Sequence, residues 1–104
     1  MTAYCFFDVR KVVDPAMLEQ YKNGVLATVQ QYNGRYLILG GKCDSVEGSW
    51  QPVTPVLIRF PNLEQAYKWY DSPEYQEIKG WRLAATQSDA VFMESEPGAF
   101  VSEV

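Results

Sequence analysis

The residues best suited to chemistry lie in one short stretch, WYDSPEYQEIKGWRL, at positions 69–83. Tyr75 and Arg82 are seven positions apart, a spacing that places two side chains on the same side of a helix. Ser72 stands directly before a proline, where a helix can begin. An arginine among aromatic rings would favour a carboxylate or an enolate-like oxygen as its ligand.

Two interpretations of this stretch are open. In the first, an apolar wall and two polar anchors form a small-molecule site, because such sites are mainly apolar with a few convergent polar groups. The wall would be Trp50, Tyr70 and Tyr75, and the anchors would be Ser72 and Arg82. In the second, Ser72 only caps a helix, the rings are core, and Arg82 pairs with a carboxylate or caps strand backbone.

Asp8 is the best single candidate for a general base. The chain has no histidine, so acid–base chemistry must use Asp, Glu, Lys, Tyr or Cys side chains. Asp8 lies within a predicted strand, between Phe6 and Arg10 on one face. The alternative is a structural ion pair between adjacent strands, with no part in catalysis.

The missing histidine also bears on metals and cofactors. Histidine-based triads, His-ligated haem and the usual zinc sites cannot form within this chain, and two isolated cysteines cannot complete a structural zinc site. We therefore expect no metal and no cofactor. Cys5 and Cys43 fall on strands that are not neighbours, so we expect no intrachain disulfide.

Composition indicates one globular domain of 104 residues, of which 47% are hydrophobic. The formal net charge of −4 argues against nucleic-acid binding, which needs a basic face. No apolar stretch approaches the ~20 residues of a membrane span, and no basic leader precedes a long apolar run. We expect a cytoplasmic protein that binds neither nucleic acid nor membrane.

The elements that would position these residues follow from capping and alternation signals. Asp14-Pro15 begins a helix that Asn33-Gly34 ends, Asn62 caps a second helix, and Ser72-Pro73 breaks that second helix in two. The predicted strands are 4–13, 35–46, 55–60 and 89–94, and the predicted helices are 15–32, 63–71 and 74–86. Residues 1–94 would form the domain, and residues 95–104 a tail that is either mobile or crosses to a partner.

This order predicts an α+β fold, the ferredoxin-like split βαββαβ sandwich with a broken second helix. Right-handed crossovers give an antiparallel sheet of order 4-1-3-2 with the helices on one face. The other face also carries apolar residues, for example Leu57, although a sheet face in water shows clean polar alternation. Tyr36 and Ile38 are expected to share one face of the second strand. A second copy is the simplest cover, giving a dimeric α/β barrel.

The chain resembles a known family on several motifs. They are Gly40-Gly41, a Glu-Gly-x-Trp turn at 47–50, Phe60-Pro61, the run Trp-Tyr-x-Ser-x-Glu-Tyr at 69–75, and Arg82. On these residues the sequence is similar to the family called domain of unknown function 1330. The resemblance implies a ferredoxin-like dimeric α/β barrel and no established reaction. The chain departs from the family pattern at Arg59, where the family commonly has an acidic residue, and at Thr54, where a basic one is common.

The leading functional hypothesis is a homodimer that binds a small carboxylate or aromatic compound. One form of it is a cofactor-independent enzyme of isomerase, cyclase or monooxygenase type, by analogy with other dimeric α/β barrels. Asp8 or a tyrosine would then transfer a proton while Arg82 stabilises negative charge. The alternatives are a non-catalytic ligand sensor or carrier, and a purely structural or protein-interaction dimer module.

Overall fold

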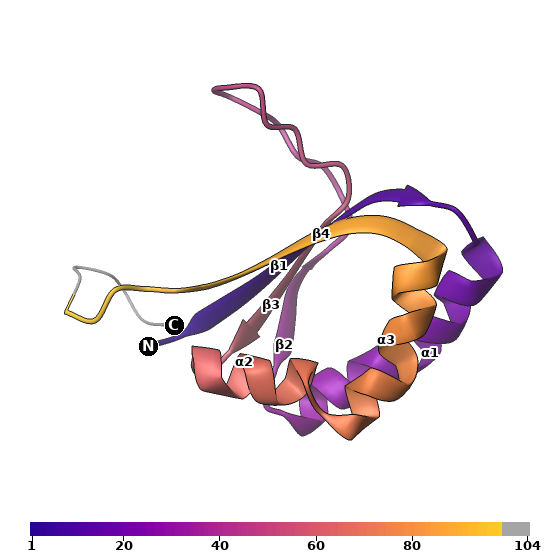
Figure 1. The fold of residues 1–104 in the computed structure, drawn as a ribbon. Coiled ribbons are helices and arrows are strands. Elements are labelled where there is room, and N and C mark those ends of the chain that lie inside the picture. Colours follow the sequence, from indigo (N-terminus) through magenta and orange to yellow (C-terminus); the bar gives the residue numbers. More distant parts are fainter. Residues whose placement is uncertain (99–104) are drawn as a thin grey trace.

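The structure is a computed structural model that describes residues 1–98 (Figure 1). Four strands and three helices follow one another in the predicted order. They are β1 (Ala3–Val12), α1 (Pro15–Gln31), β2 (Arg35–Leu39), β3 (Pro55–Phe60), α2 (Leu63–Tyr70), α3 (Pro73–Ala85) and β4 (Thr86–Glu94). Most of the predicted 95–104 tail lies outside the described residues. No helix in the described part of the chain is long and apolar enough to span a membrane.

The helices begin where the sequence places capping side chains. The carboxylate of Asp14 accepts the backbone N–H of Met17, and Pro15 occupies the first turn of α1. The side-chain oxygen of Asn62 accepts the N–H of Gln65 at 2.7 Å. Each contact satisfies an N–H group that has no partner within its own helix. The start of each of these two helices is therefore marked by a hydrogen bond to a side chain within three residues of it.

The four strands form one antiparallel sheet in the order β2-β3-β1-β4, as predicted. The three helices cover one face of it (Figure 1). Alternate strand residues point toward these helices and form the core with them. The core residues are Cys5, Phe7, Ile58 and Phe60 from the sheet, and Val25, Val29, Ala66, Trp69, Tyr75 and Ile78 from the helices.

The second strand is shorter than predicted, because it ends at Leu39 and not at position 46. Gly40 and Gly41 follow with φ angles of 76° and 106°, a left-handed backbone that turns the chain out of the sheet. The Gly40 N–H donates to the Pro55 carbonyl at 2.7 Å and closes the base of the connection. Residues 40–54 therefore form a long loop, called the β2–β3 loop below, which projects from the sheet in Figure 1.

The face of the sheet away from the helices is called the open face below, and it carries a group of apolar residues beside charged ones such as Asp8 and Arg59. A bulge between Tyr36 and Ile38 shifts the register, so Ile38 lies opposite Leu57 on the open face while Tyr36 faces the helices. The prediction that these two residues share a face was wrong because alternation cannot reveal a bulge. The apolar residues of the open face are Tyr4, Phe6, Ile38, Leu57, Val91 and Met93.

Candidate functional site

The break between α2 and α3 is a helix cap made by Ser72. The Ser72 hydroxyl accepts the N–H of Tyr75 at 3.1 Å and donates to the carbonyl of Trp69 at 2.7 Å. Pro73 follows in the first turn of α3, where its missing N–H leaves nothing unsatisfied. The single proton of this hydroxyl is thus used within the protein, which supports the capping interpretation over a ligand contact.

Beyond this cap, α1 and α3 bring together three polar side chains, Tyr21, Tyr75 and Arg82, called the phenol–arginine cluster below. The two phenol oxygens lie 2.9 Å apart, and Arg82 Nε donates to the oxygen of Tyr75 at 3.3 Å. Tyr75 and Arg82 lie on one side of α3, as their spacing predicted. Tyr21 joins them because α1 runs beside α3 (Figure 1).

Aromatic rings enclose the cluster. The ring of Tyr75 lies 4.3 Å from that of Trp69 and 5.5 Å from that of Tyr70, measured between centroids. The guanidinium carbon of Arg82 lies 5.2 Å from the centroid of the Phe7 ring, which attracts the positive charge through its electron-rich face. Tyr75 and Arg82 are 0% and 5% exposed and Tyr21 is half-buried, so the polar groups of Tyr75 and Arg82 lie in an environment of lower dielectric constant than water.

The titration of the cluster follows from this burial. Burial raises the pKa of the Tyr75 phenol, although the charge of Arg82 and a hydrogen bond with Tyr21 oppose the rise. Burial, with a smaller contribution from Tyr75, raises the pKa of Tyr21 well above its usual range. Burial disfavours the charged guanidinium of Arg82, but the nearby tyrosine oxygens outweigh it and raise the Arg82 pKa. At neutral pH the cluster therefore holds two neutral phenols and one cation.

Arg82 is a buried charge at 5% exposure. In the described part of the chain no carboxylate forms an ion pair with it, since the ion pairs join other residues. A buried cation without a counter-ion costs free energy. The cluster therefore has a net positive charge that an anion could neutralise.

Asp8 lies on the other side of the sheet and is 2% exposed. Its Oδ1 atom accepts the backbone N–H groups of Val53 and Thr54, and its Oδ2 atom binds Arg10 Nη1 at 2.8 Å. The carboxylate thus holds the end of the β2–β3 loop against β1. This geometry agrees with a structural role, although its ion-pair partner lies two residues away on the same strand and not on an adjacent strand.

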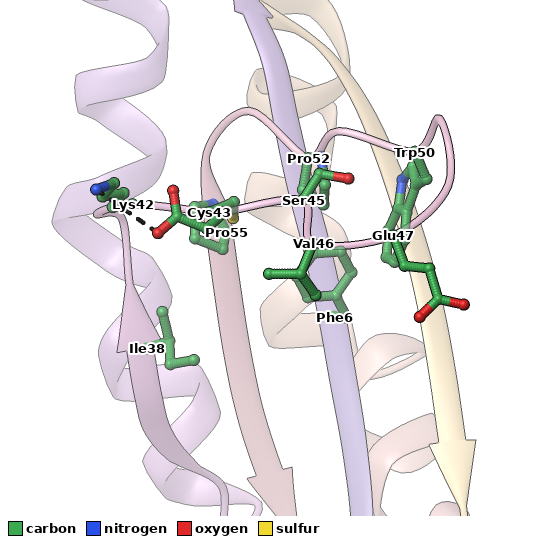
Figure 2. Close-up of a pocket in the computed structure, with 11 residues that line it drawn as sticks. Phe6, Ile38, Lys42, Cys43, Ser45, Val46, Glu47, Trp50, Pro52 and Pro55 are labelled. Atoms are coloured by element: carbon green, nitrogen blue, oxygen red, sulfur yellow. Dashed lines mark ion pairs between the residues drawn. The ribbon is translucent and has the colours of Figure 1, made fainter.

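A groove of about 420 Å³ lies between the β2–β3 loop and the open face. Figure 2 shows Trp50, Val46 and Pro52 of the loop lying over Phe6 of the sheet, with Ile38 to one side. Polar residues of the groove come from the loop itself; they are Lys42, Asp44, Ser45 and Glu47. The groove is therefore an apolar surface with a charged rim.

Trp50 belongs to this groove and not to the phenol–arginine cluster. Its ring packs edge-to-face on Phe6, with centroids 6.0 Å apart, and the side chain is 66% exposed. The structure brings together Tyr70, Ser72, Tyr75 and Arg82 on the helix side of the sheet, whereas Trp50 is on the opposite side. The expected wall of three aromatic residues therefore does not form within one chain.

Two tyrosines of the helix side were missed as site residues. Tyr21 is part of the cluster, and Tyr36 is close enough to it to affect the titration of Tyr21. Burial raises the pKa of Tyr36 to about 12. The available signal was the spacing of Leu18, Tyr21, Val25 and Val29 at three- and four-residue steps, which predicts that these side chains share a buried face of α1. A buried phenol needs a hydrogen-bond partner.

The two cysteines lie apart, Cys5 in the core and Cys43 in the groove. Both are free thiols, and burial raises the pKa of the Cys5 thiol to about 12. Cys43 lines the groove under the β2–β3 loop. In the described part of the chain, no group of three or more His, Cys, Asp or Glu side chains could hold a metal ion.

The four-stranded antiparallel sheet with its helices on one face defines the class of ferredoxin-like α+β proteins. The chain belongs to the family described as domain of unknown function (DUF1330), which it matches over residues 2–95. The family resemblance stated from the sequence motifs is thereby confirmed. No curated protein matches the chain.

Several solved structures share the fold. A crystal structure of a protein of unknown function from Rhodopseudomonas palustris is 15% identical, with a TM-score of 0.70 over 92% of this chain and 84% of that one. A dimeric ferredoxin-like protein of unknown function from Jannaschia sp. CCS1 is 11% identical, with a TM-score of 0.60 over 91% of this chain and 100% of that one. A dimeric protein of unknown function and ferredoxin-like fold from Bacteroides fragilis is 13% identical, with a TM-score of 0.57 over 90% of this chain and 96% of that one.

Proposed function

We propose that this protein is a homodimeric small-molecule-binding protein. Two copies pack with their open faces together, and each copy holds a ligand at its phenol–arginine cluster. The observation that carries the ligand site is the buried, positively charged Arg82 beside two neutral phenols. A buried cation of this kind gains a counter-ion when an anionic or strongly polar ligand binds.

The dimer is supported by the apolar open face. Val91 and Met93 are about half exposed, at 52% and 48%, and they adjoin Phe6 and Leu57 on the same face. A contiguous apolar patch of this kind on a single copy marks an interaction surface. The Jannaschia and Bacteroides proteins of the same fold are described as dimeric, which favours a second copy over another partner.

The β2–β3 loop fits the same proposal. It stands above the open face, and its exposed Trp50 lines the apolar groove between the loop and the sheet. A second copy that packs on this face would cover Trp50 and fill the groove, and isologous pairing is the commonest symmetry of such contacts. The proposed location is the cytoplasm, which agrees with the free thiols of Cys5 and Cys43.

Sedimentation equilibrium of a matched pair of variants tests the assembly. Val91→Asp adds a charge to the open face, whereas Leu83→Asp adds the same charge to α3 at a side chain of similar exposure, 57%. We expect the parent and Leu83→Asp to be dimers and Val91→Asp to be a folded monomer by circular dichroism. A parent protein that sediments as a folded single copy at low micromolar concentration would overturn the proposed dimer.

A second candidate is a cofactor-independent enzyme that acts on the same ligand. It is favoured by the hydrogen bond from Arg82 to Tyr75, since a largely buried guanidinium beside phenols can stabilise developing negative charge. Asp8 is on the far side of the sheet with its carboxylate bound to Arg10 and backbone, so a tyrosine is the better proton donor. Each ligand that stabilises the protein is incubated with it, and proton NMR spectra of the ligand are recorded over time. Conversion of the ligand to a product shows turnover, whereas an unchanged ligand shows binding alone.

A further inference from the structure

We infer that the ligand of the phenol–arginine cluster is a small organic carboxylate, and that the Tyr21 hydroxyl donates to it beside Arg82. This inference rests on the proposed ligand site and adds the chemical class of the ligand and the residue that recognises it. Tyr21 was not among the residues that sequence analysis selected. Its assignment follows from a count of hydrogen-bond donors and acceptors in the cluster.

The count begins with the three contacting groups. Arg82 Nε carries a hydrogen and can only donate, so the Tyr75 oxygen is the acceptor in the bond of 3.3 Å. The two phenols share one further bond of 2.9 Å, in which either can donate. The Arg82 Nε–H group and the two phenol O–H groups thus hold three protons, but they make only two hydrogen bonds with one another. One phenol proton is therefore left without an acceptor inside the cluster.

The position of this spare proton depends on the direction of the bond between the phenols. If Tyr75 donates to Tyr21, the free proton belongs to Tyr21, at the half-buried edge of the cluster. This direction lets the Tyr75 oxygen accept from Arg82 while its own proton is used, so every group of the buried Tyr75 is satisfied. Tyr21 is then the donor that a ligand oxygen would meet.

Arg82 adds further unused donors. Its terminal Nη groups make none of the hydrogen bonds observed among the described residues, and no described carboxylate pairs with it. A carboxylate matches this arrangement because one oxygen can accept from the guanidinium and the other from a phenol. A ligand that is itself rich in N–H donors does not match, because donors would face donors.

The charge of the ligand distinguishes a carboxylate, a monoanion, from a phosphate that carries two negative charges. The cluster contains one buried cation, and aromatic rings surround it. A further cation, Lys79, has its ammonium 4.7 Å from the centroid of the Tyr70 ring. A monoanion neutralises Arg82 without leaving a second charge to be desolvated among these rings, whereas a dianion would leave one. The rings also favour an apolar or aromatic body on the ligand.

Benzoate and its neutral counterpart benzamide are the probes for this inference. Thermal shift and isothermal titration calorimetry are measured on the parent, on Tyr21→Phe and on the matched control Tyr32→Phe. The Tyr32 hydroxyl donates to Glu74 at 2.8 Å, so the control removes a hydrogen-bonded phenol outside the cluster. We expect benzoate to bind the parent and Tyr32→Phe equally and Tyr21→Phe at least about tenfold more weakly, the lower limit for the loss of one hydrogen bond to a charged group.

Each other outcome has a definite meaning. Benzamide binding as tightly as benzoate would overturn the carboxylate class while leaving a small-molecule site in place. Equal benzoate affinity in Tyr21→Phe and the parent would overturn the role of Tyr21. If neither probe binds at millimolar concentration, both this inference and the proposed ligand site are wrong. Arg82→Lys, which keeps the charge but loses the planar fork, should weaken benzoate binding without abolishing it.

Discussion

The Oδ1 atom of Asp8 accepts the backbone N–H of Thr54 at 3.0 Å and so joins two residues 46 positions apart. The same oxygen accepts the N–H of Val53 at 2.9 Å, and the Val9 N–H donates to the Thr54 carbonyl at 3.1 Å. One buried carboxylate thereby fixes the point at which the β2–β3 loop returns to the sheet. The loop that carries Trp50 is held over the open face by this contact.

Replacing Asp8 by alanine should lower the free energy of unfolding by about 2–3 kcal/mol, because two backbone N–H groups would lose a charged acceptor. Asp8→Asn should lower the free energy of unfolding by less, since the amide oxygen can still accept the two backbone N–H groups. Asp89→Ala is the matched control, because Asp89 lies opposite Asp8 on β4 but is exposed. Urea unfolding measures the stability of all three variants. Unchanged stability in Asp8→Ala would reject the structural role and return Asp8 to the candidates for a general base.

Ser72→Ala should destabilise the protein by about 1–2 kcal/mol, the usual loss for a helix cap whose hydroxyl also donates within the core. Ser45→Ala in the exposed β2–β3 loop is the control and should change stability by less than about 0.5 kcal/mol. If Ser72 only caps α3, benzoate should stabilise Ser72→Ala as much as it stabilises the parent. A variant of unchanged stability that loses benzoate binding would make Ser72 a ligand residue instead.

The fold was predictable because its signals are local. Asp14, Asn62 and Ser72 each cap the helix that follows them, and each does so through its own side chain within three residues. With the helices placed, the alternation of β1 and β3 and the handedness of crossovers leave one sheet order. The strand order and the broken second helix were therefore predicted correctly.

The geometry of the phenol–arginine cluster was predicted only where it depends on one helix. Tyr75 and Arg82 meet because seven residues of α3 bring them to one side, a relationship that sequence spacing contains. The side of the sheet reached by Trp50 depends on the path of a loop, which Asp8 and the backbone of Gly40 set through nonlocal contacts. Tyr21 required knowing which face of α1 meets α3. Sequence periodicity shows that a face is buried but not what it meets.

Stability should fall at alkaline pH because several buried acids keep their protons in the folded state. Burial raises the pKa of both Cys5 and Tyr36 to about 12, above the values these groups have in the unfolded chain. Above about pH 9 the unfolded state therefore binds fewer protons than the folded state, and the free energy of unfolding decreases as pH rises. The decrease should continue until the pH reaches the folded-state pKa values.

Urea unfolding in steps between about pH 8 and about pH 11, at constant ionic strength, measures this slope. Tyr36→Phe removes one of the titrating groups, so its slope above about pH 10 should be shallower than that of the parent. Stability that is constant over this range would show that the phenol and thiol are accessible to hydroxide in the folded protein.

Two glycines should respond to alanine with opposite signs. A Cβ atom at Gly34 would lie 2.6 Å from Phe60 Cε1 and 2.7 Å from Val29 Cγ1, inside the core, so Gly34→Ala should destabilise the protein by about 1–3 kcal/mol. Gly80 lies within α3 with no atom within 4 Å of its Cβ position, and Gly80→Ala should stabilise by up to about 1 kcal/mol. Urea unfolding of both variants tests the pair. If Gly34→Ala is as stable as the parent, Val29 of α1 and Phe60 of β3 do not pack around Gly34 as closely as the structure has them.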